Sequence, residues 1–389
     1  MQFSSKAKGG LAVLAFLTAI GVCAWVYQLI NGLGVTGMSN VNSWGLYIAS
    51  FMLFVGLSAG GLIVASSASV FHIKQYKQVA VPAVITSTVC IMIAALFILI
   101  DLGGVQRIWR LFAGPNFTSP LLWDVCVVTT YLVINILDLL WMCGKNADDR
   151  KVEALSRVAL PVAILVHSVT AWIFGLQIAR AWYTAIMAPI FVASALDSGL
   201  AILLIALVCL DKVGLFVLSK DVFKSLAGLL ATCIAVDAFF IGCEVLTMAY
   251  PGAGESVALS HMLTGATAPF FWAEIIGGLL VPLLILVFAK NRENTALVIV
   301  ASTLVVCGVF CKRIWLLLTS FITPNVYGGP GISLGTSDAI ATHSPASVWA
   351  TVGTYAPTAF EIAIWVGVIS LGVIMFTMLS KKLLSSRAA

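Results

Sequence analysis

The chain has 389 residues, of which 61% are hydrophobic and only 10% are charged, and its formal net charge is +5 at pH 7. So much apolar sequence excludes a soluble globular domain and a nucleic-acid-binding protein, and it indicates an all-α, polytopic membrane protein. The first apolar segment, residues 11–30, is longer than the hydrophobic region of a signal peptide and has no convincing cleavage site. We therefore interpret it as a retained membrane span.

Ten apolar segments are long enough to cross a bilayer as helices, because about 20 residues span its hydrocarbon core. They cover approximately residues 11–32, 45–71, 80–102, 119–143, 158–179, 182–210, 223–249, 268–289, 295–319 and 358–380. An even number of spans places both termini on the same side, where most lysines and arginines also gather. The positive-inside rule therefore predicts that both termini are cytoplasmic. The basic residues outside this pattern are Arg107, Arg110, Arg180, Lys312 and Arg313.

An internal repeat organises the chain around the uncharged stretch from Trp44 to Ser69. Small residues recur there at spacings of three and four, which predicts close packing against another helix. Trp182 opens a partial copy, in which FVGLSAGGL becomes FVASALDSGL. Two spans after each copy, PLLWD at 120–124 is repeated as PFFWAE at 269–274. Each repeat unit therefore contains four spans in the same orientation.

The repeat predicts two four-helix bundles with two flanking helices added outside them. The predicted division is an N-terminal span at 1–44, a first four-helix bundle at 45–181, a second four-helix bundle at 182–322, and an outer loop with the C-terminal span at 323–389.

Ionisable residues inside apolar segments are costly to bury, so each one is a functional candidate. His167, Asp197 and Asp237 share a depth of roughly 20 Å from the outer ends of their helices. Their shared depth suits a proton relay, and a polar contact that pins neighbouring helices is the alternative. The pairing of His167 with Asp197, on consecutive antiparallel spans, is the form that such a pin would take.

A second acidic set is predicted near the outer surface. It consists of Asp124, Glu244, Glu274 and Glu361. With nearby aromatic residues, these carboxylates would line an amphipathic cavity that suits a quinone headgroup, which needs hydrogen-bond partners and an apolar wall. Simple pairing of these carboxylates with Arg107, Arg110 or Arg313 is the alternative, and snorkelling of Arg107 and Arg110 at the interface is a further one.

We therefore expect a quinone site near the outer end of the first bundle and a proton path from that site toward the cytoplasm. The expected quinone-binding residues are Trp44, Tyr47, Asp124, His167 and Arg180. The expected proton path consists of His167, Asp197, Asp237, Glu244 and Glu274. We expect no complete active site and no metal site in the chain.

Haem and iron–sulfur clusters are not expected. Among the four histidines, His72, His167, His261 and His343, only His167 lies in the middle of a span, whereas a b-type haem between two helices needs a pair. Histidine–methionine ligation is the haem arrangement left open. The nine cysteines form no Cys-x-x-Cys motif and favour buried free thiols over a disulfide framework. Any redox role would therefore depend on electron carriers in another subunit.

The chain resembles the NrfD/PsrC family, the membrane subunits of polysulfide-reductase-type and related complexes. The resemblance rests on WGLYIASFMLFVGLSAGG at 44–61, DLGGVQRIW at 101–109, SPLLWD at 119–124, FWAE at 271–274 and the spans that carry His167 and Asp197. The ten-span pattern, which ends in YAPTAFE at 355–361, is similar to the longer members. The family often has Asp-Leu-Gly-Arg-Pro where this sequence has Asp101-Leu-Gly-Gly-Val, so Arg107 or Arg110 would have to supply the basic side chain.

The resemblance implies menaquinone or ubiquinone as a substrate near the outer face, with no haem or iron–sulfur cluster in this chain. It implies a ferredoxin-like iron–sulfur subunit docked on that face, which commonly serves a molybdopterin catalytic subunit. It also implies a multi-pass location in the prokaryotic cytoplasmic (inner) membrane. A secondary transporter, or a proton-conducting subunit without redox chemistry, is the alternative, because repeats and buried charges occur there too. A retinal-type photoreceptor is disfavoured because Lys312 lies beside Arg313.

Overall fold

The computed structural model describes residues 5–385, except for residues 40–41, 145–146, 179, 253–254 and 323–354. The described residues form an all-α protein with ten helices that are long and apolar enough to cross a membrane, as predicted. The spans are α1 (Ser5–Asn31), α2 (Leu46–Val70), α3 (Ala80–Asp101), α5 (Pro120–Cys143), α6 (Asp149–Gly175), α7 (Met187–Val213), α8 (Lys220–Ala249), α12 (Thr295–Ile322), α14 (Ala359–Ser385) and one composite helix. The composite helix joins α10 (Ala268–Trp272), the π-helix η4 (Ala273–Leu280) and α11 (Val281–Val287).

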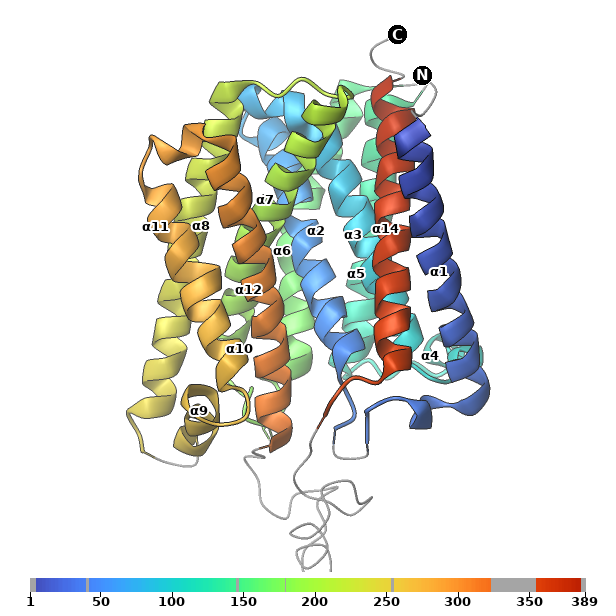
Figure 1. Ribbon diagram of the computed structural model, residues 1–389, viewed down its shortest axis with the longest axis vertical. Coiled ribbons are helices and arrows are strands. Elements are labelled where there is room, and N and C mark those ends of the chain that lie inside the picture. The colour runs from blue at the N-terminus through green and yellow to red at the C-terminus, as the bar shows by residue number, and fades with distance from the viewer. Residues whose placement is uncertain are drawn as a thin grey trace, which may run out of the picture.

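The two ends of the bundle carry different connections. Helix α1 begins and α14 ends at the same end, which we call the termini face (Figure 1). The short helices η2 (Lys74–Val79) and η5 (Asn291–Glu293) connect spans there. The opposite end carries α4 (Arg110–Ala113) and α9 (Glu255–Leu263), with η1 (Leu33–Val35) and η3 (Val105–Arg107), and we call it the α4–α9 face. Most of the predicted outer loop, with His343, lies outside the described residues.

Several spans begin some residues away from the predicted positions, and α6 and α7 are two of them. Helix α6 begins at Asp149 rather than near 158, because the side chain of Asp148 caps it by accepting hydrogen bonds from the backbone of Arg150 and Lys151. Helix α7 begins at Met187, so Trp182 lies in the preceding turn and does not open the helix. Trp182 is nevertheless buried there among other aromatic rings.

The spans pack in the two groups that the repeat predicted. Helix α2 packs against α3 and α6, and α5 also packs against both. In the second group, α7 packs against α8 and α12, and α11 packs against the same two helices. Helices α1 and α14 pack against each other beside α3 (Figure 1). The residue boundaries predicted for the four parts of the sequence remain a prediction.

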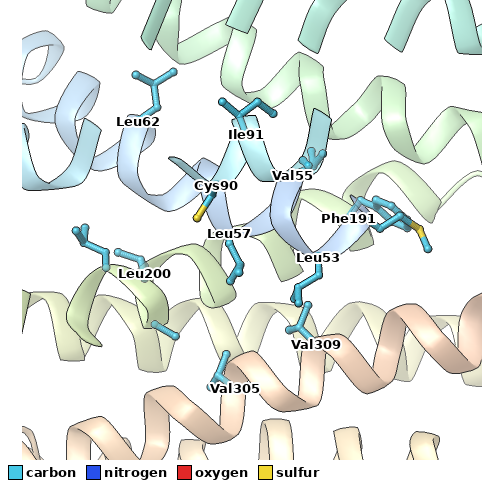
Figure 2. Close-up of a cluster of buried hydrophobic side chains, with 14 of the residues drawn as sticks. Leu53, Val55, Leu57, Leu62, Cys90, Ile91, Phe191, Leu200, Val305 and Val309 are labelled. Atoms are coloured by element: carbon cyan, nitrogen blue, oxygen red, sulfur yellow. The ribbon is translucent and has the colours of Figure 1, made fainter. Parts of the chain in front are cut away.

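The two groups meet where the repeated segments cross. A Cβ atom added to Gly60 on α2 would lie 2.1 Å from the carbonyl carbon of Gly199 on α7, so only glycine allows this approach. Apolar side chains from four helices surround the crossing, among them Leu53 on α2, Phe191 on α7 and Val309 on α12 (Figure 2). The small residues of the organising stretch therefore join its two copies.

The flanking helices α1 and α14 form a pair of their own. Gly21 on α1 faces Gly367 on α14, where an added Cβ atom would lie 2.7 Å from the opposing Cα atom. Nearer the α4–α9 face, the rings of Tyr27 and Phe360 stack with centroids 4.7 Å apart. The two flanking helices are therefore held together along most of their length.

The composite span differs from a regular α-helix at η4. Its π-helical turns widen the helix around Glu274, and wide turns of this kind are frequent at functional sites. Gly278 in η4 approaches Gly308 on α12 so closely that an added Cβ atom would lie 2.6 Å from the Cα atom of Gly308. The wide segment therefore rests directly on α12, which carries the buried basic residues.

Candidate functional site

One face of α6 lines the interior of the first bundle. His167, Thr170 and Phe174 follow one another at helical spacing, and all three side chains are buried. The hydroxyl of Thr170 donates to Oδ1 of Asp124 on α5 at 2.6 Å, and Asp124 is 2% exposed. The predicted Asp124 is therefore held inside the bundle by a neutral partner and not by an arginine.

An aromatic cluster covers this face toward the α4–α9 end. The ring of Trp44 meets Phe174 edge-on at 5.6 Å and stacks on Trp182 at 6.2 Å. Trp182 meets Phe321 at 5.5 Å, and the guanidinium of Arg180 lies over Phe321 at 4.9 Å. Partial burial lowers the pKa of Arg180 from its ordinary value. The structure therefore brings Trp44 and Arg180 into one cluster between the two bundles.

Tyr47 has a separate environment on the other side of α2. Its hydroxyl donates to Oε1 of Gln28 on α1 at 2.7 Å, and both side chains are almost fully buried. The carboxyl groups of Asp101 and Glu361 lie nearby. Tyr47 is thus tied to the flanking helices, a contact that its position in the sequence did not indicate.

His167 lies deeper than the other predicted quinone-binding residues. Its Nε2 atom is buried and forms no hydrogen bond within the described part of the protein. Its charged neighbour is Arg313 of the second bundle, and no hydrogen bond or ion pair joins it to Asp197 among the described residues. The five predicted quinone-binding residues therefore do not share one environment: Trp44 and Arg180 belong to the aromatic cluster, and Tyr47 contacts Gln28. Asp124 on α5 is bonded to Thr170, and His167 lies deeper on α6.

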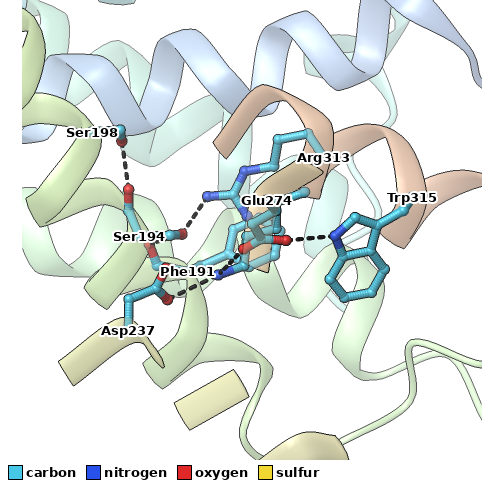
Figure 3. Close-up of polar contacts among 8 residues, drawn as sticks. Phe191, Ser194, Ser198, Asp237, Glu274, Arg313 and Trp315 are labelled. Atoms are coloured by element: carbon cyan, nitrogen blue, oxygen red, sulfur yellow. Dashed lines mark hydrogen bonds and ion pairs between the residues drawn. The ribbon is translucent and has the colours of Figure 1, made fainter. Parts of the chain in front are cut away.

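The second bundle contains a buried cluster of opposite charges (Figure 3). Nζ of Lys312 lies 2.8 and 3.0 Å from the two carboxylate oxygens of Asp237 and 3.4 Å from Oε1 of Glu274. The indole of Trp315 donates to Oε2 of Glu274 at 2.5 Å. Lys312 thereby contacts both Asp237 and Glu274, two carboxylates that we predicted to lie at different depths in the membrane.

Arg313 extends the charged cluster toward the first bundle. Its Nη2 atom donates to the hydroxyl of Ser194 at 2.6 Å, and its guanidinium lies 4.0 Å from the ring centroid of Phe191. Asp197 is fully buried one turn beyond Ser194, and neither of its carboxylate oxygens has a hydrogen-bond partner within the described residues. His167, Arg313 and Asp197 therefore lie along the boundary between the bundles.

A cavity connects the charged cluster with the α4–α9 end of the second bundle. It has a volume of about 40 Å³, room for a few water molecules, and lies between α7, α8, α9 and α12. Glu244, Lys312 and Ser320 contribute polar groups to a mostly apolar wall. The carboxylate of Glu244 also accepts a hydrogen bond of 3.1 Å from Thr184. The predicted Glu244 is therefore on the same cavity as Lys312.

Glu361 does not pair with an arginine in the described structure. It accepts hydrogen bonds from the Tyr355 hydroxyl at 2.6 Å, from the backbone of Gly37 at 2.7 Å and from the backbone of Thr358 at 2.8 Å. Burial and the neighbouring carboxylate raise the pKa of Tyr355 above its ordinary value. Through these hydrogen bonds, Glu361 holds the segment before α2 and the segment before α14 together.

Several important contacts were not found from the sequence. The sequence shows Lys312 only as a basic residue in an apolar helix, because the acids that surround it come from two other helices. Thr170 and Ser194 look like ordinary small polar residues in membrane helices. Thr170 could have been found from its position three residues after His167, on the same helix face.

Known proteins resemble this one over most of its length. The family model "Polysulphide reductase, NrfD" matches residues 34–325. A Halobacterium salinarum protein assigned as a membrane subunit of dimethyl sulfoxide reductase is 39% identical, over 96% of this sequence and 90% of its own length. The Hdr-like menaquinol oxidoreductase integral membrane subunit of Archaeoglobus fulgidus is 28% identical, over 94% of this sequence and 90% of its own. A polysulfide reductase chain of Wolinella succinogenes is 25% identical, over 72% of this sequence and 94% of its own. The protein therefore belongs to the NrfD family of polysulphide reductase membrane proteins.

Proposed function

We propose that this protein is the quinone-reactive membrane subunit of a respiratory oxidoreductase complex in the prokaryotic cytoplasmic membrane. It exchanges electrons between membrane quinone or quinol and an iron–sulfur partner subunit. The observation that carries the proposal is the buried Asp124–Thr170 pair beneath the aromatic rings of Trp44 and Phe174. The pair offers polar groups and the rings offer an apolar wall, the combination that a quinone headgroup requires.

The chemistry needs both an electron route and a proton route. Oxidation of one quinol to quinone releases two electrons and two protons. The iron–sulfur clusters of a partner subunit would accept the electrons and would serve a molybdopterin catalytic subunit. In this protein, Asp124 is placed to accept a hydrogen bond or a proton from a quinol hydroxyl, while Trp44 and Phe174 keep bulk water from the headgroup. The membrane subunit itself supplies binding and proton transfer.

The orientation supports docking of the partner on the α4–α9 face. The termini face carries most of the basic residues, so the positive-inside rule makes it cytoplasmic and makes the α4–α9 face the outer one. The aromatic cluster of Trp44, Trp182 and Arg180 lies at the outer end of the spans. An iron–sulfur cluster held just above this surface would be close to the proposed headgroup site.

The charged cluster of the second bundle supports a proton path as a further part of the proposal. The path runs from the Glu244 cavity to Lys312, Asp237 and Glu274, and continues past Asp197 to His167. Buried charges that are retained in a membrane protein commonly mark ion or proton routes. The competing explanation is structural, because the same ion pairs hold α8, η4 and α12 together.

Asp124→Asn tests the quinone site. The experiment uses the purified complex and measures quinol-dependent reduction of the iron–sulfur clusters in the partner subunit. We expect the variant to assemble normally but to lose most of this reduction, because an amide cannot take up a proton. Asp138→Asn is the matched control, since Asp138 is also buried on α5 but lies nearer the termini face. Unchanged turnover in Asp124→Asn would remove Asp124 from the site.

Transport without redox chemistry is the second candidate, and η4 is the observation in its favour. Transporters bind substrates at interrupted helices, and η4 interrupts the regular geometry of the span that carries Glu274. Purification of the protein without any iron–sulfur subunit, together with substrate counterflow in vesicles that contain this protein alone, would favour transport. Co-purification of the iron–sulfur subunit and quinol-dependent cluster reduction would favour the first proposal.

A further inference from the structure

The first bundle contains a second buried carboxylate, Asp138, which the proposed proton path does not use. Asp138 lies five residues before the end of α5 at the termini face, and it is 1% exposed. Neither of its carboxylate oxygens has a hydrogen-bond partner within the described part of the protein, and it forms no ion pair there. Because a buried carboxylate without a partner is costly, such a group points to a bound water molecule or cation.

The register of α5 and α6 brings Asp138 to the level of Ser156. The two helices are consecutive and antiparallel, and the hydrogen bond from Thr170 to Asp124 fixes which residues face each other. Asp138 follows Asp124 by 14 residues. Ser156 precedes Thr170 by the same number, so both lie about 21 Å nearer the termini face. A spacing of two heptads also keeps each residue on the same helix face as its counterpart.

A serine of α2 lies at the same level. The hydrogen bond from Tyr131 to the backbone of Ser58 sets the register of α5 and α2, which run in the same direction. Asp138 lies seven residues beyond Tyr131 on α5. Ser66 lies eight residues beyond Ser58 on α2, so it reaches nearly the same depth. Ser66 and Ser156 are both almost fully buried, and neither hydroxyl has a partner among the described residues.

These three polar groups point to bound water rather than to bonds within the protein. Hydroxyls in helices often donate to the carbonyl oxygen one turn earlier, as that of Thr88 does to Val84 at 2.7 Å. Within the described structure, the hydroxyls of Ser66 and Ser156 do not, so both are available to a ligand. Buried polar groups of this kind are normally joined by ordered water. A few water molecules between Asp138 and the two serines would complete their hydrogen bonds.

No ionised group of the described residues neutralises Asp138. Helices α2 and α3 carry no charged residue in the half near the termini face. On α6, Arg157 pairs with Glu153 at 2.8 Å, and both side chains are exposed. Nearer the start of α6, Lys151 lies 3.8 Å from Asp148, also at the surface. Neutralisation of Asp138 therefore requires a cation from solution, and a proton carried by bound water is the smallest such cation.

Further polar groups lie between Asp138 and His167. Asn135 is one turn from Asp138 on the same face of α5. Its amide nitrogen donates to the carbonyl oxygen of Tyr131 at 2.8 Å, and its Oδ1 atom has no partner among the described residues. His167 lies about 16 Å from the level of Ser156 along α6, and its Nε2 atom is equally unpartnered there. Asn135 and Tyr131 therefore divide this interval into short steps that water molecules can complete.

We propose that Asp138, with Ser66 and Ser156, forms a hydrated site that exchanges protons between His167 and the cytoplasm. This inference rests on the proposed function and completes its proton path. That path runs from the Glu244 cavity at the α4–α9 face to His167, and it has no connection to the termini face. Asp138 supplies the connection from within the first bundle, because a carboxyl group near the end of α5 can bind a proton from bound water and release it again.

Asp138→Asn and Asp138→Glu test the inference in the complete complex, reconstituted in sealed vesicles with the termini face inward. The measured quantity is the change of internal pH per quinol oxidised. We expect Asp138→Asn to lose most of this ratio, because an amide cannot bind and release a proton. Quinol oxidation continues in this variant, since protons released near Asp124 still have the Glu244 cavity as an outlet. Asp138→Glu should keep the ratio.

The two variants also separate proton exchange from a structural role. Asparagine has the size of aspartate, whereas glutamate is larger. If Asp138 only packed the bundle, Asp138→Asn would therefore keep the wild-type ratio and Asp138→Glu would disturb the protein more. Ser156→Ala serves as a second variant, since it removes one hydroxyl of the hydrated site and leaves the carboxyl group in place. We expect it to lower the ratio less than Asp138→Asn does.

Ser302→Ala is the matched control for Ser156→Ala. Ser302 is fully buried on α12, its hydroxyl has no partner among the described residues, and it lies seven residues from the start of its helix, as Ser156 does on α6. Its ratio should equal that of the wild type. An unchanged ratio in Asp138→Asn, an equal loss in Asp138→Glu, or equal effects of the two serine variants would overturn the inference. A wild type that oxidises quinol without changing the internal pH would overturn this inference alone, whereas a wild type without quinol oxidation would remove the proposed function as well.

Discussion

The two bundles differ in the partners of their buried polar side chains. In the first bundle, neutral groups bond to one another around Tyr131: its hydroxyl lies 2.9 Å from the Ser87 hydroxyl and donates at 2.9 Å to the carbonyl oxygen of Ser58. In the second bundle, Lys312 lies between Asp237 and Glu274, and all three side chains are almost fully buried. Neutral hydrogen-bonding groups suit recognition of an uncharged headgroup, whereas compensated charges suit the binding and release of a proton.

The charge balance of the second bundle sharpens the contrast. Fully ionised, Asp197, Asp237 and Glu274 carry three negative charges, while Lys312 and Arg313 carry two positive ones. One bound proton would cancel the remaining charge, and uncompensated charge inside a bilayer is costly. Net neutrality of these five side chains would therefore require one bound proton in addition to their ion pairs. The first bundle has no corresponding buried lysine or arginine among its described spans.

Removal of the central cation should have the largest effect on stability. Lys312→Met leaves Asp237 and Glu274 buried without a positive charge, and loss of one partner from a buried ion pair costs about 3–5 kcal/mol. We expect a large decrease in the melting temperature of the purified protein in detergent. A triple variant that adds Asp237→Asn and Glu274→Gln should recover much of the loss, because the buried charges are then gone as well.

The matched control for this prediction is an exposed ion pair of the same bundle. Nζ of Lys224 lies 2.5 Å from the Glu293 carboxylate at the termini face, where both side chains are exposed. Such pairs contribute little, so Lys224→Met should leave the melting temperature nearly unchanged. If Lys312→Met and Lys224→Met had equal effects, the buried cluster would not be the stabilising feature of the second bundle.

The crossing of the two bundles should be the next most sensitive position. Gly60→Ala places a methyl group 2.1 Å from the carbonyl carbon of Gly199, so α2 and α7 must separate. We expect a loss of about 1–3 kcal/mol in unfolding free energy, the usual cost of overpacking. Gly242→Ala on α8 is the control, because nothing lies within 4 Å of its added Cβ atom. Equal stability of the two variants would show that the bundles tolerate a wider separation.

Much of the fold could be predicted from the sequence, because length and composition are sufficient to identify membrane spans. The repeat around Trp44 and Trp182 also indicated that two similar groups of helices exist. It did not show that Gly60 and Gly199 bring the two copies into direct contact, because a repeat gives no distances between its units. The start of α6 was missed because Asp148 caps a helix that extends well into the polar loop.

The candidate site was less accessible to sequence reasoning. Their similar depth along the helices predicted that His167, Asp197 and Asp237 lie at one level. In the structure, the long side chain of Lys312 instead joins Asp237 to Glu274. A lysine side chain reaches several ångströms, so residues at different depths can share one ammonium group. The widened turns of η4 around Glu274 leave no signature in the pattern of apolar residues.

Asp197→Asn distinguishes a proton path from a structural pin, with a small expected effect on stability. The amide keeps the size of the carboxyl group, and no hydrogen-bond partner of Asp197 within the described residues would be lost. If protons pass through the second bundle, the variant should no longer change the internal pH of vesicles during quinol turnover. Ser198→Ala, one residue further on α7, is the control. Wild-type pH changes in the Asp197 variant would leave the charged cluster a purely structural role.

The smallest expected effect concerns acid sensitivity at the termini face. The hydrogen bond and charge of Lys224 lower the pKa of Glu293 from its ordinary value. Because the pKa is lower in the folded protein than in the unfolded state, the pair stabilises the fold above the ordinary glutamate pKa of about 4.3. This stabilisation disappears as the pH falls through the lowered pKa, so the melting temperature of the wild type should decrease slightly more on acidification than that of Glu293→Gln.

Melting curves between about pH 6 and about pH 3 test this prediction, since the ordinary glutamate pKa lies inside that window. Asp221→Asn is the control, because Asp221 lies in the first turn of α8, near Lys224, and forms no ion pair within 4 Å among the described residues. Parallel curves for the wild type and Glu293→Gln would mean that solvent screens the exposed pair completely. Among the described residues of the second bundle, the ammonium group of Lys312 would then be the lysine charge that still contributes to stability, because it is held away from water.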